Sequence, residues 1–370
     1  MLQEYFYKEA ESIISKHDSE STQIDLEKFL KDNFKNEPLE VQNRIINEFF
    51  GYGPLHSILG NTNITEIIIN SPKNIIYEEN GTFIKHTDSF YNDKTFDNFI
   101  HKLNFETQTQ INLHKPHLNT NWNGFRVHII IPPISKSSCV TIRRHSHSKW
   151  NFENLIASGW AQESQILFLK EQIQKQKNIL IVGPTGSGKT TILNCCLQSI
   201  PPLDRCVIIE DTDELICPNA ASTKLLTRLE HSTDLMGYSQ ADLLKQSLRM
   251  RPNRIIVGEI RGDEAKDYLM ALSTGHEGGL CSLHANHPKQ ALLRLEMLIQ
   301  MGAPQWSLLA IRQLIQLSLD LIVTVNIKNN KRELQSIDSL SSLEDSGFIL
   351  ESLFNNEQDN SFKLLNNCAE

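Results

Sequence analysis

The feature that most constrains this chain is a glycine-rich loop, GPTGSGKTT, between two segments of different pattern. It matches the spacing GxxxxGK[ST]. An apolar run, NILIV, comes directly before it and predicts a buried strand, while TTILNCCLQ follows and is compatible with a helix. Strand, loop and helix in this order are the context in which the motif forms a phosphate-binding loop. The candidate nucleotide-binding residues here are Gly183, Pro184, Thr185, Gly186, Ser187, Gly188, Lys189, Thr190 and Thr191.

The chemistry of such a loop follows from its residue types. Glycines allow the backbone to fold into a concave nest of N–H donors, and the following helix presents its N-terminus to the same phosphates. We expect Lys189 to reach the β- and γ-phosphates and Thr190 to ligate Mg²⁺, so that ATP and Mg²⁺ are the expected ligands. No NKxD element is present, which disfavours guanine specificity.

Acidic residues directly follow two other apolar segments. Glu259 follows IIVG, where phosphate-loop enzymes place a residue facing Mg²⁺ or the attacking water, and is our candidate proton acceptor. Glu210 and Asp211 follow VII, and we expect both to face one Mg²⁺ because parallel strands present their carboxyl ends to the ligand. The alternative for each segment is a solvated charge at a strand end, and these short patterns leave both readings open.

Two histidines flank a further apolar segment, LCSL. His276 precedes it and His284 follows it, and no metal-ligand spacing connects them with cysteines. A strand-end histidine can sense the γ-phosphate, whereas a lone histidine is more often structural.

Composition narrows the classes of function. The chain has 36 Lys and Arg against 44 Asp and Glu, a net charge of −8, which argues against general nucleic-acid binding. No apolar run is long enough to span a membrane and the first residues do not form a secretory signal. The seven cysteines include no CxxC pair, so we expect buried, reduced thiols and a cytoplasmic protein.

The pattern along the chain predicts an α/β fold in several parts. Residues 1–50 are predicted to be helical, with a polar loop at 17–22, and residues 51–145 to form an α+β domain. A polar segment, HSHSKW, lies at the start of a predicted linker over 146–159. Residues 160–355 alternate strands with helices, which predicts a largely parallel sheet covered on both faces. The tail over 356–370 is expected to be disordered.

The expected elements have defined limits. In the α+β domain we predict strands over 64–70, 74–78, 126–131 and 140–143 and a helix over 93–103. In the following domain we predict strands over 178–183, 206–211, 254–260, 278–285 and 320–327, helices over 162–175, 189–199, 239–250, 263–274, 288–301 and 304–318, and a hairpin from 331. Ser239 with Asp242 predicts a capping box, and Gly275 and Gly302 predict helix C-termini.

Taken together, the motifs resemble those of a known family. GPTGSGKTT, IIEDTDEL, RMRPNRIIVGEIRGDEA and TGHEGGLCSLHAN resemble the Walker A motif, Asp box, Walker B motif and His box of the type II/type IV secretion ATPases. YGPLHSILGNTNITEIIIN and GFRVHIIIPP followed by CVTIRRH look like the CpaF-type tight-adherence pilus assembly ATPases. The resemblance covers roughly residues 40–330. The chain has Asn123-Gly-Phe-Arg126 where that group usually has DGSR, and it lacks the tetracysteine insert of many extension ATPases.

The resemblance implies a homohexameric Mg²⁺-dependent ATPase motor for pilus assembly or protein secretion. It implies a RecA-like domain, ATP bound between that domain and the N-terminal domain, and docking on an inner-membrane platform protein at the cytoplasmic face, without direct nucleic-acid contact. The alternatives are a conjugation-type type IV secretion traffic ATPase, a nucleotide-switched assembly module with little turnover, and a RecA-like helicase. The residues carried over are Glu259 as catalytic carboxylate, Glu210 and Asp211 as Asp box, His276 and His284 as His box, Arg126, Arg143 and Arg144 as arginines that approach the phosphates, and Arg261 beside the Walker B motif.

Overall fold

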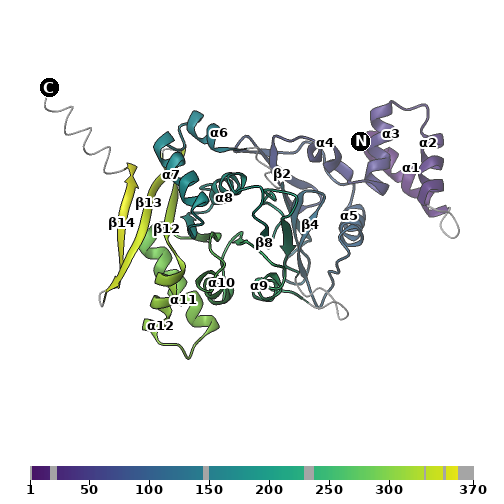
Figure 1. Ribbon diagram of the computed structural model, residues 1–370. Coiled ribbons are helices and arrows are strands. Elements are labelled where there is room, and N and C mark those ends of the chain that lie inside the picture. The colour runs from purple at the N-terminus through teal and green to yellow at the C-terminus, as the bar shows by residue number, and fades with distance from the viewer. Residues whose placement is uncertain are drawn as a thin grey trace, which may run out of the picture. The chain divides into compact units, whose positions relative to one another are not determined.

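The computed structural model describes residues 2–16, 23–144, 150–228, 237–328, 331–344 and 347–356. These residues form two compact units, one up to residue 144 and the other from residue 150 (Figure 1). The expected loop at 17–22, nearly all of the HSHSKW segment and the tail beyond residue 356 lie outside the described residues.

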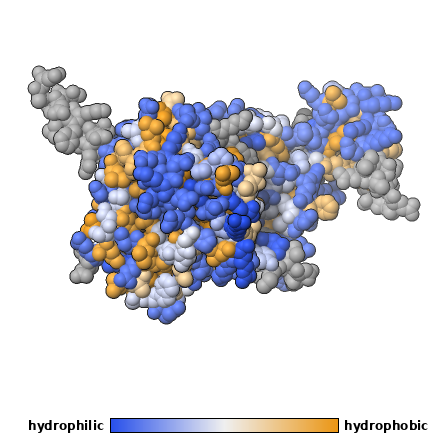
Figure 2. All heavy atoms as spheres, viewed as in Figure 1, coloured by the Kyte–Doolittle hydropathy of each residue, from blue (hydrophilic) through white to orange (hydrophobic). Residues whose placement is uncertain are grey.

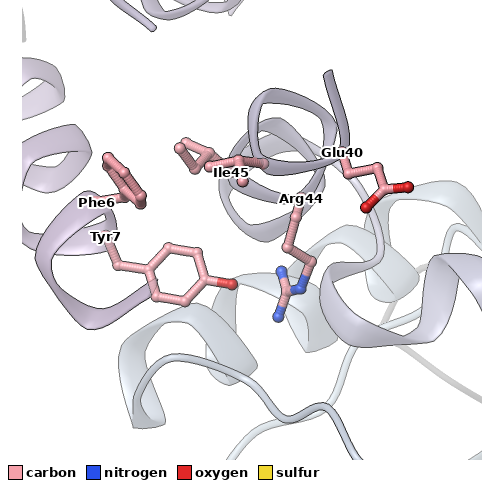
Figure 3. Close-up of a pocket in the computed structure, with 6 residues that line it drawn as sticks. Phe6, Tyr7, Glu40, Arg44 and Ile45 are labelled. Carbon is pink, nitrogen blue, oxygen red and sulfur yellow. The ribbon is translucent and has the colours of Figure 1, made fainter. Parts of the chain in front are cut away.

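The first unit begins with three helices, α1 (Leu2–Lys16), α2 (Gln23–Asn33) and α3 (Leu39–Phe50). Their shared core contains Phe6, Leu30, Phe34 and Ile45. A cavity of about 230 Å³ lies between α1 and α3, with Tyr7 and Arg44 among the residues that line it (Figure 3). Arg44 is held there by ion pairs to Glu48 and Asp88.

A six-stranded antiparallel sheet forms the rest of this unit, in the order β3-β2-β1-β6-β5-β4. Its core is rich in phenylalanine, and α5 begins with a capping box between Asn92 and Thr95. The elements are η1 (Gly53–Leu55), α4 (His56–Leu59), β1 (Ile64–Ser71), β2 (Asn74–Glu79), β3 (Thr82–Lys85), α5 (Asp93–Glu106), β4 (His117–Trp122), β5 (Phe125–Ile130) and β6 (Cys139–Arg144).

The second unit is built on an eight-stranded mixed sheet in the order β14-β13-β12-β7-β11-β10-β8-β9. The strands from β12 to β9 pair in parallel, whereas β13 and β14 add an antiparallel edge. The strands are β7 (Ile179–Gly183), β8 (Cys206–Glu210), β9 (Thr223–Leu226), β10 (Arg254–Val257), β11 (Leu280–His284), β12 (Leu321–Lys328), β13 (Lys331–Glu344) and β14 (Gly347–Asn355).

Helices cover both faces of this sheet, as expected (Figure 1). Along β7, Ile179 and Ile181 join the core under α7 and α8, while Leu180 and Val182 join the opposite core with α10 to α12. Burial of both faces explains why these strands are continuously apolar. The helices are α6 (Phe152–Ala157), α7 (Glu163–Gln174), α8 (Lys189–Gln198), α9 (Gln240–Ser247), α10 (Glu264–Ser273), α11 (Pro288–Gly302) and α12 (Leu308–Ser318).

The structure corrects several local expectations. Residues 152–157, placed in the linker, form α6, and Phe152 and Leu155 are buried in the core of the second unit. Gly302 is the last residue of α11 and packs against Asp263 instead of ending the helix in a left-handed conformation. Gly275 does adopt that conformation, with φ of 101°, and the Ser239–Asp242 capping box is present.

The surface is mixed. Figure 2 shows hydrophilic residues over most of the visible face, interrupted by separate apolar patches. Six free cysteines occur in the described part of the chain, of which Cys195, Cys196, Cys206 and Cys281 are buried. No helix in that part is long and apolar enough to cross a bilayer.

Candidate nucleotide site

The glycine-rich loop connects β7 with α8 as the motif predicts. Gly188 has φ of 95°, and a Cβ atom there would lie 2.4 Å from the ring of Trp160. Only glycine meets both requirements, the left-handed backbone and the close approach of Trp160. The loop therefore keeps its shape through its glycines and through a tryptophan that sequence reasoning did not connect with it.

Lys189 is buried at the start of α8. Its Nζ donates to the carbonyl oxygens of Gly183 at 2.9 Å and Pro184 at 3.0 Å and lies 3.0 Å from Nδ1 of His284. Burial lowers the pKa of the Lys189 ammonium to about 8, the Glu259 carboxylate opposing this shift and Arg261 adding to it. The phosphate loop thus holds a desolvated cation whose charge a bound phosphate would stabilise.

His284 ends β11 and connects this lysine with Glu259. Its Nε2 lies 3.0 Å from Oε1 of Glu259. Burial lowers the pKa of His284, although Glu259 opposes the shift, so the ring is neutral near pH 7. A neutral ring accepts from the Lys189 ammonium at Nδ1, while its Nε2 faces the Glu259 carboxylate.

Arg261 continues the same line of contacts. Its Nη2 donates to Oε2 of Glu259 at 2.6 Å and its Nη1 to Oδ2 of Asp211 at 3.1 Å. Thr227 and Gln240 donate in turn to Oδ1 of Asp211, at 2.9 and 3.0 Å. The structure therefore brings five of the predicted residues together in one polar network: Lys189, His284, Glu259, Arg261 and Asp211.

Glu210 does not join this network. Its buried carboxylate accepts from the backbone N–H groups of Glu214, at 3.3 Å, and Leu215, at 3.1 Å. Burial raises the pKa of Glu210 to about 7, and the two N–H groups oppose this shift. The expectation that Glu210 and Asp211 face one Mg²⁺ does not hold here, because the two neighbouring carboxylates have separate partners and Glu210 is turned to the backbone of the following loop.

Gly258, directly before Glu259, packs closely against the neighbouring strand β8. A Cβ atom at Gly258 would lie 3.1 Å from Cβ of Glu210 on the neighbouring strand. This contact is tighter than side chains ordinarily make, so a larger residue would push Glu210 away from the loop that it holds. The missing side chain of Gly258, just after β10, thus leaves room for the buried Glu210 at the end of β8.

The two histidines lie apart. His276 precedes the first residue of β11 and His284 is its last, so the strand separates them. Nδ1 of His276 lies 3.3 Å from the carbonyl oxygen of Ala271 at the end of α10. Within this unit His276 therefore does not accompany His284 at the phosphate loop, contrary to the expectation of a shared His box.

The three predicted arginines of the first unit have different surroundings. Arg144 donates to the backbone carbonyls of Leu59, Asn61 and Ile64 and lies over the ring of Phe125, which is a structural role in its own unit. Arg126 and Arg143 are directly opposite each other on β5 and β6. Neither forms an ion pair within the described residues.

Comparison with known proteins identifies the family. The family model described as "Type II/IV secretion system protein" matches residues 108–344, more than half of the chain. The chain belongs to this family. The probable conjugal transfer protein TrbB of Sinorhizobium fredii is 31% identical over 300 residues, which cover 80% of this chain and 88% of that protein. The type IV secretion system protein PtlH of Bordetella pertussis is 31% identical over 73% of this chain and 88% of its own length.

A solved structure supports the fold. The ATPase DotB of Legionella pneumophila aligns with a TM-score of 0.56 at 18% identity, over 76% of this chain and 78% of that one. The expected α/β architecture with an N-terminal α+β sheet is therefore confirmed. The finer expectation of a CpaF-type member is not supported, since both relatives carry conjugal-transfer or type IV secretion names.

Proposed function

We propose that this protein is an ATP-hydrolysing motor of a type IV, conjugation-type secretion system. The observation that carries the proposal is the line of contacts from Lys189 through His284 to Glu259, which connects the phosphate loop with a carboxylate that lies just after β10. The secretion and conjugation names of the relatives support the choice of machine. For this reason we now favour type IV secretion over the pilus assembly that the sequence motifs suggested.

Each residue of the site has a proposed task. Backbone N–H groups of the loop bind the phosphates, and Lys189 contacts the β- and γ-phosphates. Glu259 orients the attacking water and accepts its proton, and His284 and Arg261 hold its two carboxylate oxygens. Asp211 fixes Arg261 because its Oδ2 atom accepts from Nη1 of the arginine.

The site fits Mg²⁺ through Thr190 alone among the predicted ligands. Thr190 is half-buried in the first turn of α8, whereas Glu210 accepts from backbone N–H groups and Asp211 accepts from Arg261, Thr227 and Gln240. One protein oxygen is sufficient, because Mg²⁺ keeps several waters and takes its other ligands from phosphates. When bound, the ion would neutralise phosphate charge.

We further propose the assembly in which this site works. The first unit, up to residue 144, is the N-terminal part, and the second unit, from residue 150, is the RecA-like ATPase domain. Six copies form a ring in which Arg126 and Arg143 approach the phosphates. The ring docks on an inner-membrane partner at the cytoplasmic face of the membrane. Family membership supports this arrangement, and heterologous contacts that close produce such rings.

The catalytic part of the proposal predicts the behaviour of Glu259→Gln. The variant should bind ATP like the parent, because the phosphate loop is unchanged, while phosphate release falls by about 10²-fold or more. Steady-state phosphate release and equilibrium nucleotide binding measure the two effects. Glu277→Gln, an exposed carboxylate elsewhere in the same unit, serves as the control and should hydrolyse ATP at the parent rate. Near-parent turnover of Glu259→Gln would remove this residue from catalysis.

The choice of machine needs a test in the host cell. A strain that carries Glu259→Gln in place of the parent chain should lose conjugation-type transfer or effector secretion and keep its surface pili. Loss of pili with normal transfer would return the assignment to pilus assembly.

A further inference from the structure

The strand pair β12–β13 extends along the phosphate loop. β12 pairs with β7 from Leu321 opposite Ile179 to Thr324 opposite Val182, and it continues to Lys328 although β7 ends at Gly183. β13 returns beside it, with Arg332 opposite Ile327 (Figure 1). The part of β12 after Thr324 and the beginning of β13 therefore project past the end of β7. They lie on the edge of the sheet where the phosphate loop lies.

Arg332 makes three contacts with this loop and its support. Its Nε donates to the carbonyl oxygen of Gly186 at 2.9 Å, and its Cδ lies 3.5 Å from the position of a Cβ atom at Gly188. Its guanidinium carbon lies 5.9 Å from the centre of the Trp160 ring. Within the described part of the chain no carboxylate pairs with Arg332, and its two Nη groups have no hydrogen-bond partner. An exposed cation is thus fixed beside the loop with most of its donors available.

The strand order tells which end of a bound nucleotide this cation can reach. β12 and β13 lie on one side of β7, and β11, β10 and β8 lie on the other. The second group carries His284, Glu259 and Asp211, and Lys189 leans toward it through its contact with His284. If Glu259 acts on the γ-phosphate, that phosphate lies on the β11 side, and Arg332 flanks the opposite, nucleoside end.

We propose that Arg332 binds the nucleoside end of ATP and ADP, at the α-phosphate and the adjoining sugar. This inference rests on the proposed function, because it takes the γ-phosphate to lie beside Glu259. The bond from Nε to Gly186 fixes the plane of the guanidinium, and its Nη groups then offer paired N–H donors to phosphate and hydroxyl oxygens. Lysine cannot reproduce this planar fork.

The test separates nucleotide binding from catalysis. In Arg332→Ala the dissociation constant of ADP and the KM of ATP should both rise about 10-fold, because a charge-assisted contact made equally to both nucleotides is lost. The value of kcat should stay within about 2-fold of the parent, since the transition state keeps its contacts on the β11 side. Arg332→Lys should retain part of the affinity.

Lys331→Ala is the matched control. It removes the same charge from the neighbouring exposed position of β13 and should leave both affinities unchanged. Three results for Arg332→Ala would overturn the inference. The first is affinities for both nucleotides equal to those of the parent, and the second is a raised KM of ATP with an unchanged dissociation constant of ADP. The third is a fall in kcat without a change in KM, which indicates that Arg332 only shapes the loop. A parent chain that neither binds nor hydrolyses ATP would instead overturn the proposed function together with this inference.

Discussion

At the residue scale, His284 is the link between the phosphate loop and Glu259. Replacing it with alanine removes the contact at Oε1 of Glu259 and leaves that carboxylate with Arg261 as its remaining partner. We expect His284→Ala to lower turnover about 10-fold or more, because a mispositioned base transfers protons poorly. ADP affinity should remain within about 3-fold, since the loop backbone is intact. Phosphate release and ADP titration measure both quantities.

A nearby histidine provides the control for this prediction. His287 is exposed at the start of α11 and does not cap the helix with its side chain, so His287→Ala should hydrolyse ATP like the parent. Turnover of His284→Ala within about 2-fold of the parent would contradict the bridging role of His284.

The sequence was sufficient for those residues whose position follows from a strand end. Lys189, Asp211, Glu259 and His284 each end or follow a parallel strand or begin the helix after it, and the carboxyl ends of such strands meet at one edge. The direction in which the Glu210 side chain points was not predictable from the sequence, because it depends on packing against Gly258 across the sheet. Arg332 was missed because its contact is with Gly186, 146 residues earlier in the chain, and arises only once the β12–β13 hairpin lies beside the phosphate loop.

At the element scale, Arg254 ties the start of β10 to its neighbours. Its side chain is fully buried, pairs with Asp204 at 2.7 Å and donates to the carbonyl oxygen of Ile173 in α7 at 2.9 Å. Arg254→Met should lower the free energy of unfolding by about 3 kcal/mol, because the substitution leaves a partly buried carboxylate without its partner. Urea unfolding measures the loss.

Two further variants test the cause of this loss. Asp204→Asn added to Arg254→Met should recover part of the stability, since the unpaired charge is then removed. Lys175→Ala breaks an exposed pair with Glu171 and should cost no more than about 0.5 kcal/mol. An Arg254→Met variant as stable as the parent would show that the buried pair contributes nothing.

Regular elements were predictable where one pattern persists over several residues. The apolar strands β7, β8 and β11 and the helices α8 and α11 appear close to their expected limits. β9 has four residues, none of them buried, so no period is present to detect. β14 depends on antiparallel pairing with β13, and α6 has only six residues, too few to show a helical period.

At the scale of the whole molecule, the first unit carries two arginines, Arg126 and Arg143, that have no ion-pair partner within the described residues. Arg126 and Arg143 are cross-strand neighbours, and like charges in this position destabilise a sheet. Glu66 is opposite Arg143 on β1, yet within the described residues it forms no ion pair with either arginine. A phosphate brought to these side chains would relieve the repulsion, which motivates their proposed role in turnover.

The ring proposal and this arginine pair give the last prediction together. Arg126→Ala and Arg143→Ala should each lower turnover about 10-fold or more, because phosphate charge loses an arginine partner, while the melting temperature stays near that of the parent.

If the pair acts on the nucleotide of a neighbouring copy, mixing Arg143→Ala with Glu259→Gln should restore part of the activity. Mixed rings would then contain sites that combine an intact Glu259 from one copy with an intact Arg143 from the next. Phosphate release across mixing ratios, with Lys136→Ala as an exposed cation of the same unit for comparison, measures this effect. Parent-level turnover in both single variants would confine the first unit to a role in docking.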